Sequence, residues 1–465
     1  MEYKFKRTYC NPLPMPDYPH GSEVNGFSNC RELADPTVIW HRNKWILYAT
    51  IGSVYESEDY KNWKVCTQCD MPKLVAPTVV EHKNKFYLMG SESALYCADS
   101  PYGPFEELGK ITDDTGEELY IRDPMLFSDD DEKLYLYWGL GKDGIYGMEL
   151  DHKQPCRGIG KPISLCKFCP EHVWERMGAW NQNEGMSFIE GAWMLKHQGE
   201  YYLIYSASGT CYRTYAWGVY RSRSPLKDFI YQKTGPILLK KYGLVNGTGH
   251  GSVVKGPGHT YWAFYTVKMC YATKYERRIA MDPVGFDETG NLYIGEVTEI
   301  PQWLPGIKKN PEKGNDSGLL PLTSEEQAVT SSHAPGRDAL YAVDESMLTW
   351  WEPSDKDSRP FITIDLRACY KIAAIRIIWR DVNLDYEKGI LPGPFQYKVE
   401  GSKEGTRFEE ILDCTDNQMD YAVDYRTFPE KEARHIRLVI TGCPEGIRPG
   451  VINFTAFGTY ADIQE

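Results

Sequence analysis

Five segments of the chain repeat one pattern of polar and hydrophobic positions. Each begins with a small or acidic residue, continues through an apolar strand and a polar turn, and ends in a second strand rich in aromatic residues. The segments start at Ala34, Ala76, Arg122, Ile189 and Gly249. Because short apolar strands joined by polar turns are typical of β-hairpins, the pattern predicts five similar hairpins.

The fourth copy shows the predicted hairpin most clearly. Residues 192–196 read AWMLK, residues 197–200 form a polar turn with Gly199, and residues 201–206 read YYLIYS. A looser second half follows several copies, as in "SVYESEDYKNWKV" and "GVYRSRSPLKDFIY". The copies start roughly 40 to 70 residues apart, which is enough for a four-stranded unit with its loops.

These repeats predict an all-β protein whose residues 1–305 form a five-bladed β-propeller. A β-sandwich built from many hairpins is the alternative, but it does not explain why one order of elements occurs five times. After this part, residues 306–322 are rich in Pro, Gly and Lys and are typical of a linker. Residues 323–465 contain short alternating strands, such as FITIDL and HIRLVI, and predict a β-sandwich (jelly-roll) domain.

One position of the repeat carries candidate chemistry. Just before the first strand of each copy stand, in order, Asp35, Ala76, Asp123, Glu190 and His250. Because the equivalent strand of every blade faces the propeller axis, these five "column" residues are expected to converge. Each acid alone fits a simple bond to a turn amide at a strand start. Three acids in one column favour a shared site, because convergent buried carboxylates repel each other.

Three convergent carboxylates fit acid–base chemistry. Glycoside hydrolysis needs one carboxyl group that protonates the departing oxygen and a second that activates water or attacks the sugar. A third carboxylate near the acid raises the pKa of that acid by like-charge repulsion. The column therefore predicts a hydrolase that cleaves glycosidic bonds.

Composition narrows the class of partner. Hydrophobic residues make up 42% and charged residues 25% of the chain, which is typical of a folded globular protein. The net charge of −13 argues against nucleic acid, and no apolar run is long enough to span a bilayer. The 33 Tyr and 13 Trp residues suit β-sheets and stacking on sugar rings. We expect a carbohydrate substrate and no obligate protein partner.

The start of the chain and the cysteines give less information about function than the repeat does. No apolar signal segment follows Met1, so a secreted or periplasmic protein with its signal removed is favoured and a cytoplasmic one is the alternative. The 13 cysteines include two CxxC pairs, Cys66 with Cys69 and Cys166 with Cys169. These pairs are either zinc or redox sites or buried, unreactive thiols, and the second interpretation is favoured.

The ordered motifs resemble a known family. "ADPTV", "RDPMLF", "IEGAW" with "GEYYLIYS", and "GTGHGSV", spread over residues 8–305, look like glycoside hydrolase family 43. The resemblance implies a five-bladed propeller and an inverting enzyme, with activities that include α-L-arabinofuranosidase, β-xylosidase, endo-arabinanase and galactosidase. Many members read Glu-Gly-Pro where this chain has Glu190, Gly191 and Ala192, so the subgroup is not fixed.

The resemblance also implies residue roles. Asp35 would be the general base, Glu190 the general acid, and Asp123 would orient the acid and tune its pKa. His250 matches an axial histidine that helps to hold a calcium ion or a water cluster in some members. An arginine, here Arg277 or Arg278, would reach the substrate. No cofactor is required on this interpretation, apart from a structural calcium ion in some members.

Two loops flank the fourth hairpin and are candidates for specificity. The long insertion before it carries Trp174, Trp180 and Asn181, and the segment after it carries Tyr212 and Trp217. Each residue either lines a sugar subsite or packs onto the blade. Among them, Trp180 and Trp217 are the predicted substrate contacts. Bulky aromatic loops close one end of a groove, which favours exo-action on chain ends or short branches of plant polysaccharide.

The second domain resembles the discoidin, or coagulation factor type C, domains, which are close to carbohydrate-binding family 32. The resemblance rests on "YAVDESMLTWWEP", "PFITIDLRACYKIAAIRI" and "ARHIRLVITG". It implies either sugar binding, with Trp350 and Trp351 as candidate platforms, or bracing of the propeller, which is favoured. A calcium ion often lies near the first of these motifs.

The sequence is less consistent with two other functions. A non-catalytic carbohydrate-binding propeller would be favoured if the column lacked an acid, but all three acids are present. A retaining enzyme of the related fructan-active families would carry an "NDPNG"-like strand start, which this sequence lacks.

Overall fold

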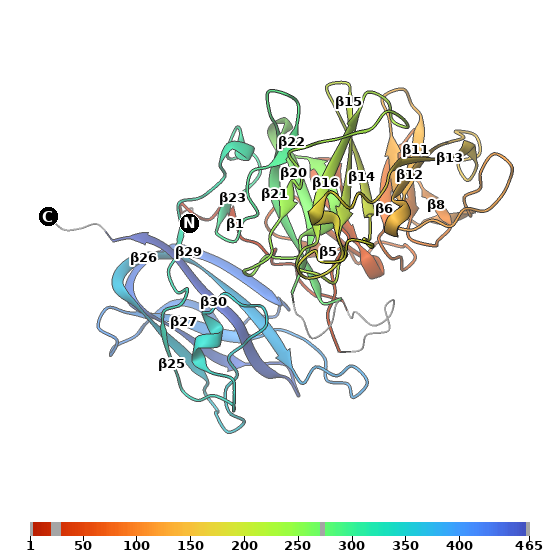
Figure 1. Cartoon of the computed structure of the whole chain (residues 1–465). Helices are drawn as coiled ribbons and strands as arrows, with labels where there is room; N and C mark the ends of the chain where they lie inside the picture. Colours follow the sequence, from red (N-terminus) through yellow and green to blue (C-terminus); the bar gives the residue numbers. More distant parts are fainter. Residues whose placement is uncertain (1–2, 20–28, 270–274, 462–465) are drawn as a thin grey trace.

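The computed structural model describes residues 3–19, 29–269 and 275–461. Its regular structure is almost entirely β, as predicted, and two bodies are visible (Figure 1). The helical elements are single 3₁₀ turns: η1 (Thr50–Gly52), η2 (Gly141–Asp143), η3 (Val173–Glu175), η4 (Pro257–His259), η5 (Pro311–Lys313) and η6 (Ala339–Ala342). No helix of the described residues is long and apolar enough to cross a membrane.

The first body is a five-bladed propeller, which confirms the predicted fold class. Each blade is an antiparallel sheet built from consecutive strands. Blade I contains β2 (Thr37–His41), β3 (Lys44–Ala49), β4 (Ser53–Ser57) and β5 (Lys64–Val65). Blade II contains β6 (Thr78–His82), β7 (Lys85–Met89), β8 (Leu95–Ala98) and β9 (Glu106–Gly109). Blade III contains β10 (Met125–Ser128), β11 (Leu134–Trp138), β12 (Ile145–Leu150) and β13 (Gly158–Cys166).

The last two blades follow the same order. Blade IV contains β14 (Glu190–His197), β15 (Glu200–Ala207), β16 (Ala216–Ser222) and β17 (Ile230–Tyr231), with the short β18 (Leu238–Leu239) also paired to β16. Blade V contains β19 (Gly249–Lys255), β20 (Tyr261–Lys268), β21 (Arg277–Phe286) and β22 (Leu292–Ile294). Outside the blades, β1 (Thr8–Tyr9) pairs with β23 (Gln302–Trp303).

The second strand of each blade is apolar on both faces because each face meets a different neighbour. In blade I, Trp45 and Leu47 pack toward blade V, whereas Ile46 and Tyr48 pack toward blade II. Side chains alternate between the two faces of a strand, so a sheet packed between two others reads as a continuous apolar run. This packing explains why the repeated strands, such as "WILYA", lack polar positions.

A repeated turn links each blade to the one before it. Asp35, Ala76, Asp123 and His250 have left-handed backbones, with φ of 54°, 48°, 49° and 20°. The backbone N–H of each donates to a hydroxyl of the preceding blade, in the same order Thr266, Thr50, Ser91 and Ser206. In blade IV the left-handed residue is Gly191, at φ 58°. The turn therefore repeats in structure in all five blades, and in blade IV the column residue Glu190 stands one residue before the equivalent position.

The second body is a β-sandwich, as predicted. It comprises β24 (Leu320–Pro321), β25 (Gln327–Thr330), β26 (Phe361–Val382), β27 (Gln396–Ser402), β28 (Glu409–Cys414), β29 (Val423–Gly442) and β30 (Arg448–Tyr460). The long β26 and β29 pair with irregular register near residues 365–374 and fold the sheet around one core. The domain boundaries stay predictions; β24, inside the predicted linker, pairs with β30.

The two candidate tryptophans of the sandwich are engaged by protein groups. Trp351 is fully buried in the core, and its Nε1 donates to the carbonyl of Ser332 over 3.0 Å. The guanidinium of Arg337 lies 3.3 Å from the ring centre of Trp350.

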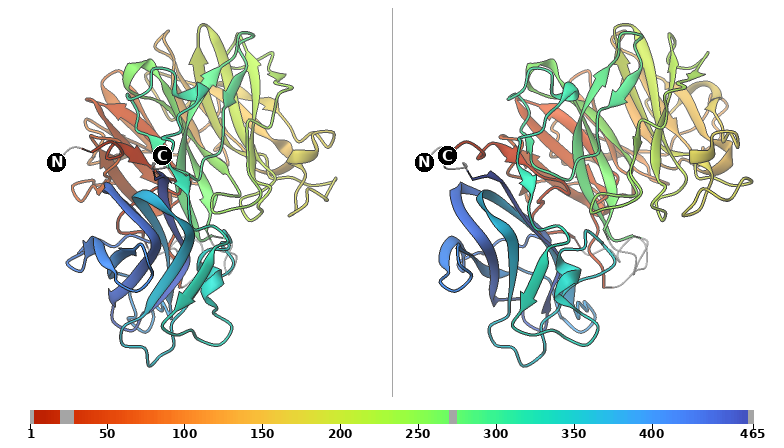
Figure 2. Two further views of the ribbon diagram at one scale, coloured as in Figure 1. Left: turned by 90° about the vertical axis from the view of Figure 1, so that its left-hand side faces the viewer. Right: turned by 60° about the vertical axis from the view of Figure 1, so that its left-hand side comes forward.

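The sandwich packs closely against the propeller (Figure 2). One shared apolar cluster joins Phe5 and Cys10 to Tyr425 and Phe457, and a second joins propeller residues, including Leu244, to the sandwich. The hydroxyl groups of Thr8 and Tyr425 lie 2.7 Å apart. This continuous contact is the arrangement expected of a bracing domain.

Candidate active site

The column residues of blades I, III, IV and V meet in one place. Nδ1 of His250 lies 3.4 Å from Oδ1 of Asp35 and 3.6 Å from Oδ2 of Asp123. The residue after Glu190, Gly191, packs directly against the His250 ring. Asp35, Asp123 and Glu190 are only 5%, 8% and 8% exposed, so their charges interact with little screening by water. The fifth column residue, Ala76, carries no chemistry.

Asp35 lies among groups that stabilise its ionised form. Its Oδ1 is 3.1 Å from Nη1 of Arg277, and its Oδ2 accepts a 2.7 Å hydrogen bond from the Thr50 hydroxyl. Burial alone would raise the pKa of Asp35, but the charges of Arg277 and His250 and the two hydrogen bonds together lower that pKa below its usual value. Asp35 is therefore suited to accept a proton near neutral pH.

Arg277 is itself fixed by a carboxylate that the sequence did not point to. Nε of Arg277 donates to Oε1 of Glu32 over 2.7 Å, and Nη2 contacts the same oxygen. Nη1 also donates to the Thr210 hydroxyl over 3.1 Å. Glu32 lies outside the repeated column, so no repeat signal marks it. The planar guanidinium thereby holds two buried carboxylates, Glu32 and Asp35, in a fixed relation.

The surroundings of Glu190 together favour its protonated form. Its Oε1 accepts a 2.7 Å hydrogen bond from the hydroxyl of Tyr215, on the loop after β15, and this bond alone lowers the pKa of Glu190. Burial raises the pKa of Glu190 well above its usual value, and the negative charges of Asp123 and Asp35 raise it further. Glu190 is therefore suited to carry a proton near neutral pH.

Asp123 is held by the preceding blade. Its Oδ1 accepts a 3.1 Å hydrogen bond from the Ser91 hydroxyl, and its backbone N–H donates to the same hydroxyl. This pair fixes Asp123 beside His250, where its charge acts on Glu190. The arrangement fits the predicted tuning role.

Gly191 is required by the close approach of His250. A Cβ at this position would lie 2.8 Å from Cγ of His250 and 3.1 Å from Oγ of Ser206, and its φ of 58° is rarely adopted by residues with side chains. The glycine after Glu190 therefore lets the histidine of blade V pack against the acid of blade IV.

Two predicted substrate contacts lie away from this centre. Arg278 is 2% exposed; its Nη1 donates to the carbonyls of Arg31 and Arg277, and its guanidinium stacks on Tyr18. Side chains alternate along β21, so Arg278 faces away from Asp35 while Arg277 faces it. Trp217 is 1% exposed and packs in the core between blades IV and V. Both positions are structural.

Trp180 remains at the surface. It is 65% exposed, and the guanidinium of Arg213 lies 4.0 Å from its ring centre. Arg213 follows Thr210 on the loop that also contacts Arg277, and its Nε donates to the carbonyl of Ala179. Trp174 and Asn181 are buried, and Asn181 accepts a hydrogen bond from Lys241. Of the loop candidates, Trp180 is the large hydrophobic side chain that is mostly exposed, and the Arg213 guanidinium lies over its ring.

The described residues do not form an evident metal centre. Within residues 3–19, 29–269 and 275–461, no group of three or more His, Cys, Asp and Glu side chains is arranged to hold a metal ion. His250 instead directs Nδ1 at two carboxylates. The calcium ion stays a prediction, and no chemical step below depends on it.

The two CxxC pairs lie in different places. Cys66 and Cys69 pack between blades I and II, whereas Cys166 packs between blades III and IV. Burial raises the pKa of the Cys166 thiol to about 12, which disfavours the reactive thiolate. The other three thiols are partly exposed, and desolvation raises their pKa values as well.

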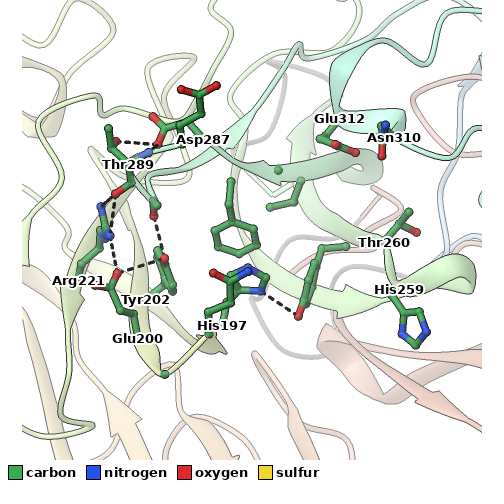
Figure 3. Close-up of a pocket in the computed structure, with 18 of the residues that line it drawn as sticks. His197, Glu200, Tyr202, Arg221, His259, Thr260, Asp287, Thr289, Asn310 and Glu312 are labelled. Atoms are coloured by element: carbon green, nitrogen blue, oxygen red, sulfur yellow. Dashed lines mark hydrogen bonds and ion pairs between the residues drawn. The ribbon is translucent and has the colours of Figure 1, made fainter.

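One pocket lies away from the column. It has a volume of about 820 Å³ and lies among the turns at residues 197–200, 257–261 and 286–290, at the ends of the strands opposite to the column (Figure 3). Its polar groups largely bind one another: Arg221 contacts Glu200, and the Tyr202 hydroxyl donates to the carbonyl of Gly290. This pocket is therefore separate from the convergent carboxylates.

Glycoside hydrolysis uses a pair of carboxyl groups, and this propeller brings three buried carboxyl groups together. The family model described as "Glycosyl hydrolases family 43" matches residues 31–292, more than half of the chain. The protein belongs to glycoside hydrolase family 43. A second family model, "F5/8 type C domain", matches residues 326–450.

Named relatives share moderate identity with part of the chain. A β-D-galactofuranosidase of Aspergillus niger is 27% identical over 43% of this chain and 53% of its own length. A β-xylosidase of Xylanibacter ruminicola is 27% identical over 42% of this chain and 63% of its own length. The chain thus spans between about half and two thirds of these relatives.

A solved structure supports the fold. The crystal structure of a thermostable family-43 glycoside hydrolase superposes with a TM-score of 0.52 at 23% identity. The match covers 65% of this chain and 100% of the other chain. At this identity the likeness concerns the fold alone.

Proposed function

We propose that this protein is an inverting, exo-acting glycoside hydrolase of the α-L-arabinofuranosidase or β-xylosidase type. One observation carries the proposal: two carboxyl groups of one buried site have their pKa values pushed in opposite directions, Asp35 down by Arg277 and Glu190 up by burial and Asp123. A site with one ionised and one protonated carboxyl group at the same pH can supply a base and an acid together.

The chemistry assigned to the residues is as follows. Asp35, ionised, accepts a proton from a water molecule that attacks the anomeric carbon. Glu190, protonated, donates its proton to the departing glycosidic oxygen. Asp123 keeps Glu190 protonated through its charge, and His250 spaces the two aspartates. Each turnover consumes one water and leaves Asp35 protonated and Glu190 ionised, so one proton must pass back before the next cycle.

The proposed substrate class is supported by the names of the relatives and by one exposed aromatic residue, Trp180. The named relatives include a β-xylosidase and a xylosidase/arabinosidase, which supports a pentose at the cleaved end of plant polysaccharide or oligosaccharide. The exposed ring of Trp180 is assigned to the sugar that follows. The β-D-galactofuranosidase name of another relative supports a galactose-releasing enzyme as the second candidate.

The test has two parts. A panel of 4-nitrophenyl pentosides and hexosides identifies the sugar, and proton NMR of the first product identifies its anomeric configuration. We expect release of a pentose with inverted configuration. Retention of configuration, or equal turnover by the Asp35→Ala variant, would contradict the proposal.

A further inference from the structure

We propose that the C-terminal sandwich positions the catalytic base Asp35 through two interdomain ion pairs, Arg31–Asp381 and Glu276–Arg380. The inference rests on the proposed function, because it assumes that Asp35 is the base. It goes beyond bracing, since it assigns part of the catalytic geometry to residues of the second domain.

The first step concerns what fixes Asp35. Arg277 binds Asp35 through Nη1 and Glu32 through Nε and Nη2. Arg277 is 4% exposed and Glu32 is fully buried. Any shift of either side chain therefore moves the guanidinium relative to the Asp35 carboxylate.

The second step concerns the two segments that carry this pair. The N–H of Leu33 donates to the carbonyl of Arg277 over 3.2 Å, so the two segments run side by side. Nη1 of Arg278 donates to the carbonyl of Arg31 over 2.8 Å and crosslinks them again. The segments act as one unit.

The third step is that the sandwich binds both segments at the neighbouring positions. Arg31 precedes Glu32 in the chain, and its Nε lies 2.8 Å from Oδ2 of Asp381, while its Nη1 lies 2.6 Å from Oδ2 of Asp420. Glu276 precedes Arg277, and its Oε2 lies 2.9 Å from Nη1 of Arg380.

These ion pairs come from one place on the sandwich. Arg380 and Asp381 are adjacent near the end of β26, and Asp420 lies just before β29. Arg31 is 1% exposed, so its charge relies on Asp381 and Asp420 for compensation. The sandwich thus binds Arg31 and Glu276, the residues that directly precede Glu32 and Arg277, and the ion pair of Glu32 with Arg277 fixes Asp35.

The ion pairs supplement an apolar interface. The two domains also share two apolar clusters and the Thr8–Tyr425 contact. One of these clusters includes Met269, whose N–H donates to the carbonyl of Glu276. The polar contacts at Arg31 and Glu276 add charged anchors next to Glu32 and Arg277, the ion pair that reaches the proposed base.

The test measures the pH dependence of kcat/KM together with the melting temperature of the full chain. The base must be ionised, so the acidic limb reports the pKa of Asp35. The ionisable groups that face Asp35 or its immediate partners are Arg277, His250, Glu190, Tyr215, Asp123 and Glu32. If Arg277 moves away, the pKa of Asp35 rises and the acidic limb moves to higher pH.

Asp381→Asn is expected to move the acidic limb upward and to lower kcat on the order of tenfold, because sub-ångström displacements of reacting groups are costly. Arg380→Gln is the second variant and removes the other ion pair, with Glu276. Because the Arg380 side chain is partly exposed, this variant is expected to fold even if Asp381→Asn does not. Tyr425→Phe is the matched control: it removes an interdomain hydrogen bond elsewhere and should leave the pH profile unchanged.

The outcomes separate this inference from the proposed function. Lower melting temperatures with an unmoved acidic limb in both Asp381→Asn and Arg380→Gln would overturn it. Full activity of Asp35→Ala would instead remove the proposed base and, with it, the function on which the inference rests.

Discussion

The two sides of the active site carry the same functional group in opposite surroundings. Asp35 lies against a buried arginine and a histidine, whereas Glu190 meets a neutral phenol and two carboxylates. Asp35 stands at the left-handed position of its blade turn, and Glu190 directly precedes the equivalent residue of its own blade, Gly191. The difference shows that the repeat brings carboxylates to the axis, while burial and the neighbouring charges favour opposite protonation states in the two residues.

The largest expected effect comes from removing either carboxylate. Asp35→Ala and Glu190→Ala should each lower kcat by about 10²- to 10⁴-fold. On a substrate with an activated dinitrophenolate leaving group, which needs no protonation, Glu190→Ala should recover much of its turnover and Asp35→Ala should not. Equal recovery of turnover in both variants would contradict the assignment of Glu190 as the acid and Asp35 as the base. Glu200→Ala, in the opposite pocket, is the control.

The next effect concerns the arginine on the base side. Arg277→Met removes the cation that lowers the pKa of Asp35, so the acidic limb of kcat/KM should move to higher pH. Glu32 is then left buried without this partner, and unfolding should become easier by about 3–5 kcal/mol. Denaturant titration measures the second effect, and an unmoved acidic limb would contradict the first.

A smaller shift is expected on the acid side. Asp123→Asn removes a negative charge that raises the pKa of Glu190, so that pKa falls and the basic limb moves to lower pH by about one unit. The protonated fraction of Glu190 near pH 7 then decreases, and turnover decreases with it. A basic limb that stays in place would show that Asp123 acts by another route.

Tyr215→Phe should act in the opposite direction and more weakly. The Tyr215 hydroxyl stabilises ionised Glu190, so its loss raises the pKa of Glu190 and moves the basic limb to higher pH. Activity should change only a few-fold, as expected for one hydrogen bond. Opposite shifts in Asp123→Asn and Tyr215→Phe, recorded in one assay series, would define the acid side.

The smallest effect is expected from chelation. No step above uses a metal ion, so exhaustive dialysis against EDTA should leave kcat and both limbs unchanged. A divalent cation near His250 would lower the pKa values of the carboxylates on both sides. If activity is lost and calcium restores it, a metal ion contributes to the protonation states of the two sides of the site, and the protein's own charges do not explain the difference alone.

The sequence predicted the parts of the site that repeat. Asp35, Asp123 and His250 converge because each stands at the same point of a blade, and Glu190 stands one residue before that point in blade IV, so the spacing of the repeat along the sequence records the site. The choice between Arg277 and Arg278 needed the side-chain alternation of β21, which depends on strand position. Trp217 was misplaced for the same reason, since its alternation directs it into the core.

Other parts had no sequence signal. Glu32 and Tyr215 lie on loops that occur once, so no repeat marks them. The contacts of Arg31 and Glu276 with the sandwich depend on how two domains dock, which local patterns do not encode. The order of elements was predictable because both domains have regular apolar periodicity.

The way the ring is joined has one more consequence. Among the described strands, every blade is a continuous piece of chain, so no strand is shared between the last blade and the first. The two blades meet through hydrogen bonds such as those from the backbone N–H groups of Asp35 and Val38 to the hydroxyl groups of Thr266 and Ser252. The proposed base therefore stands on the seam of the propeller. The rate of hydrolysis therefore also reports whether the ring is closed. If blade V separates from blade I, the proposed base loses its alignment even when each sheet stays folded.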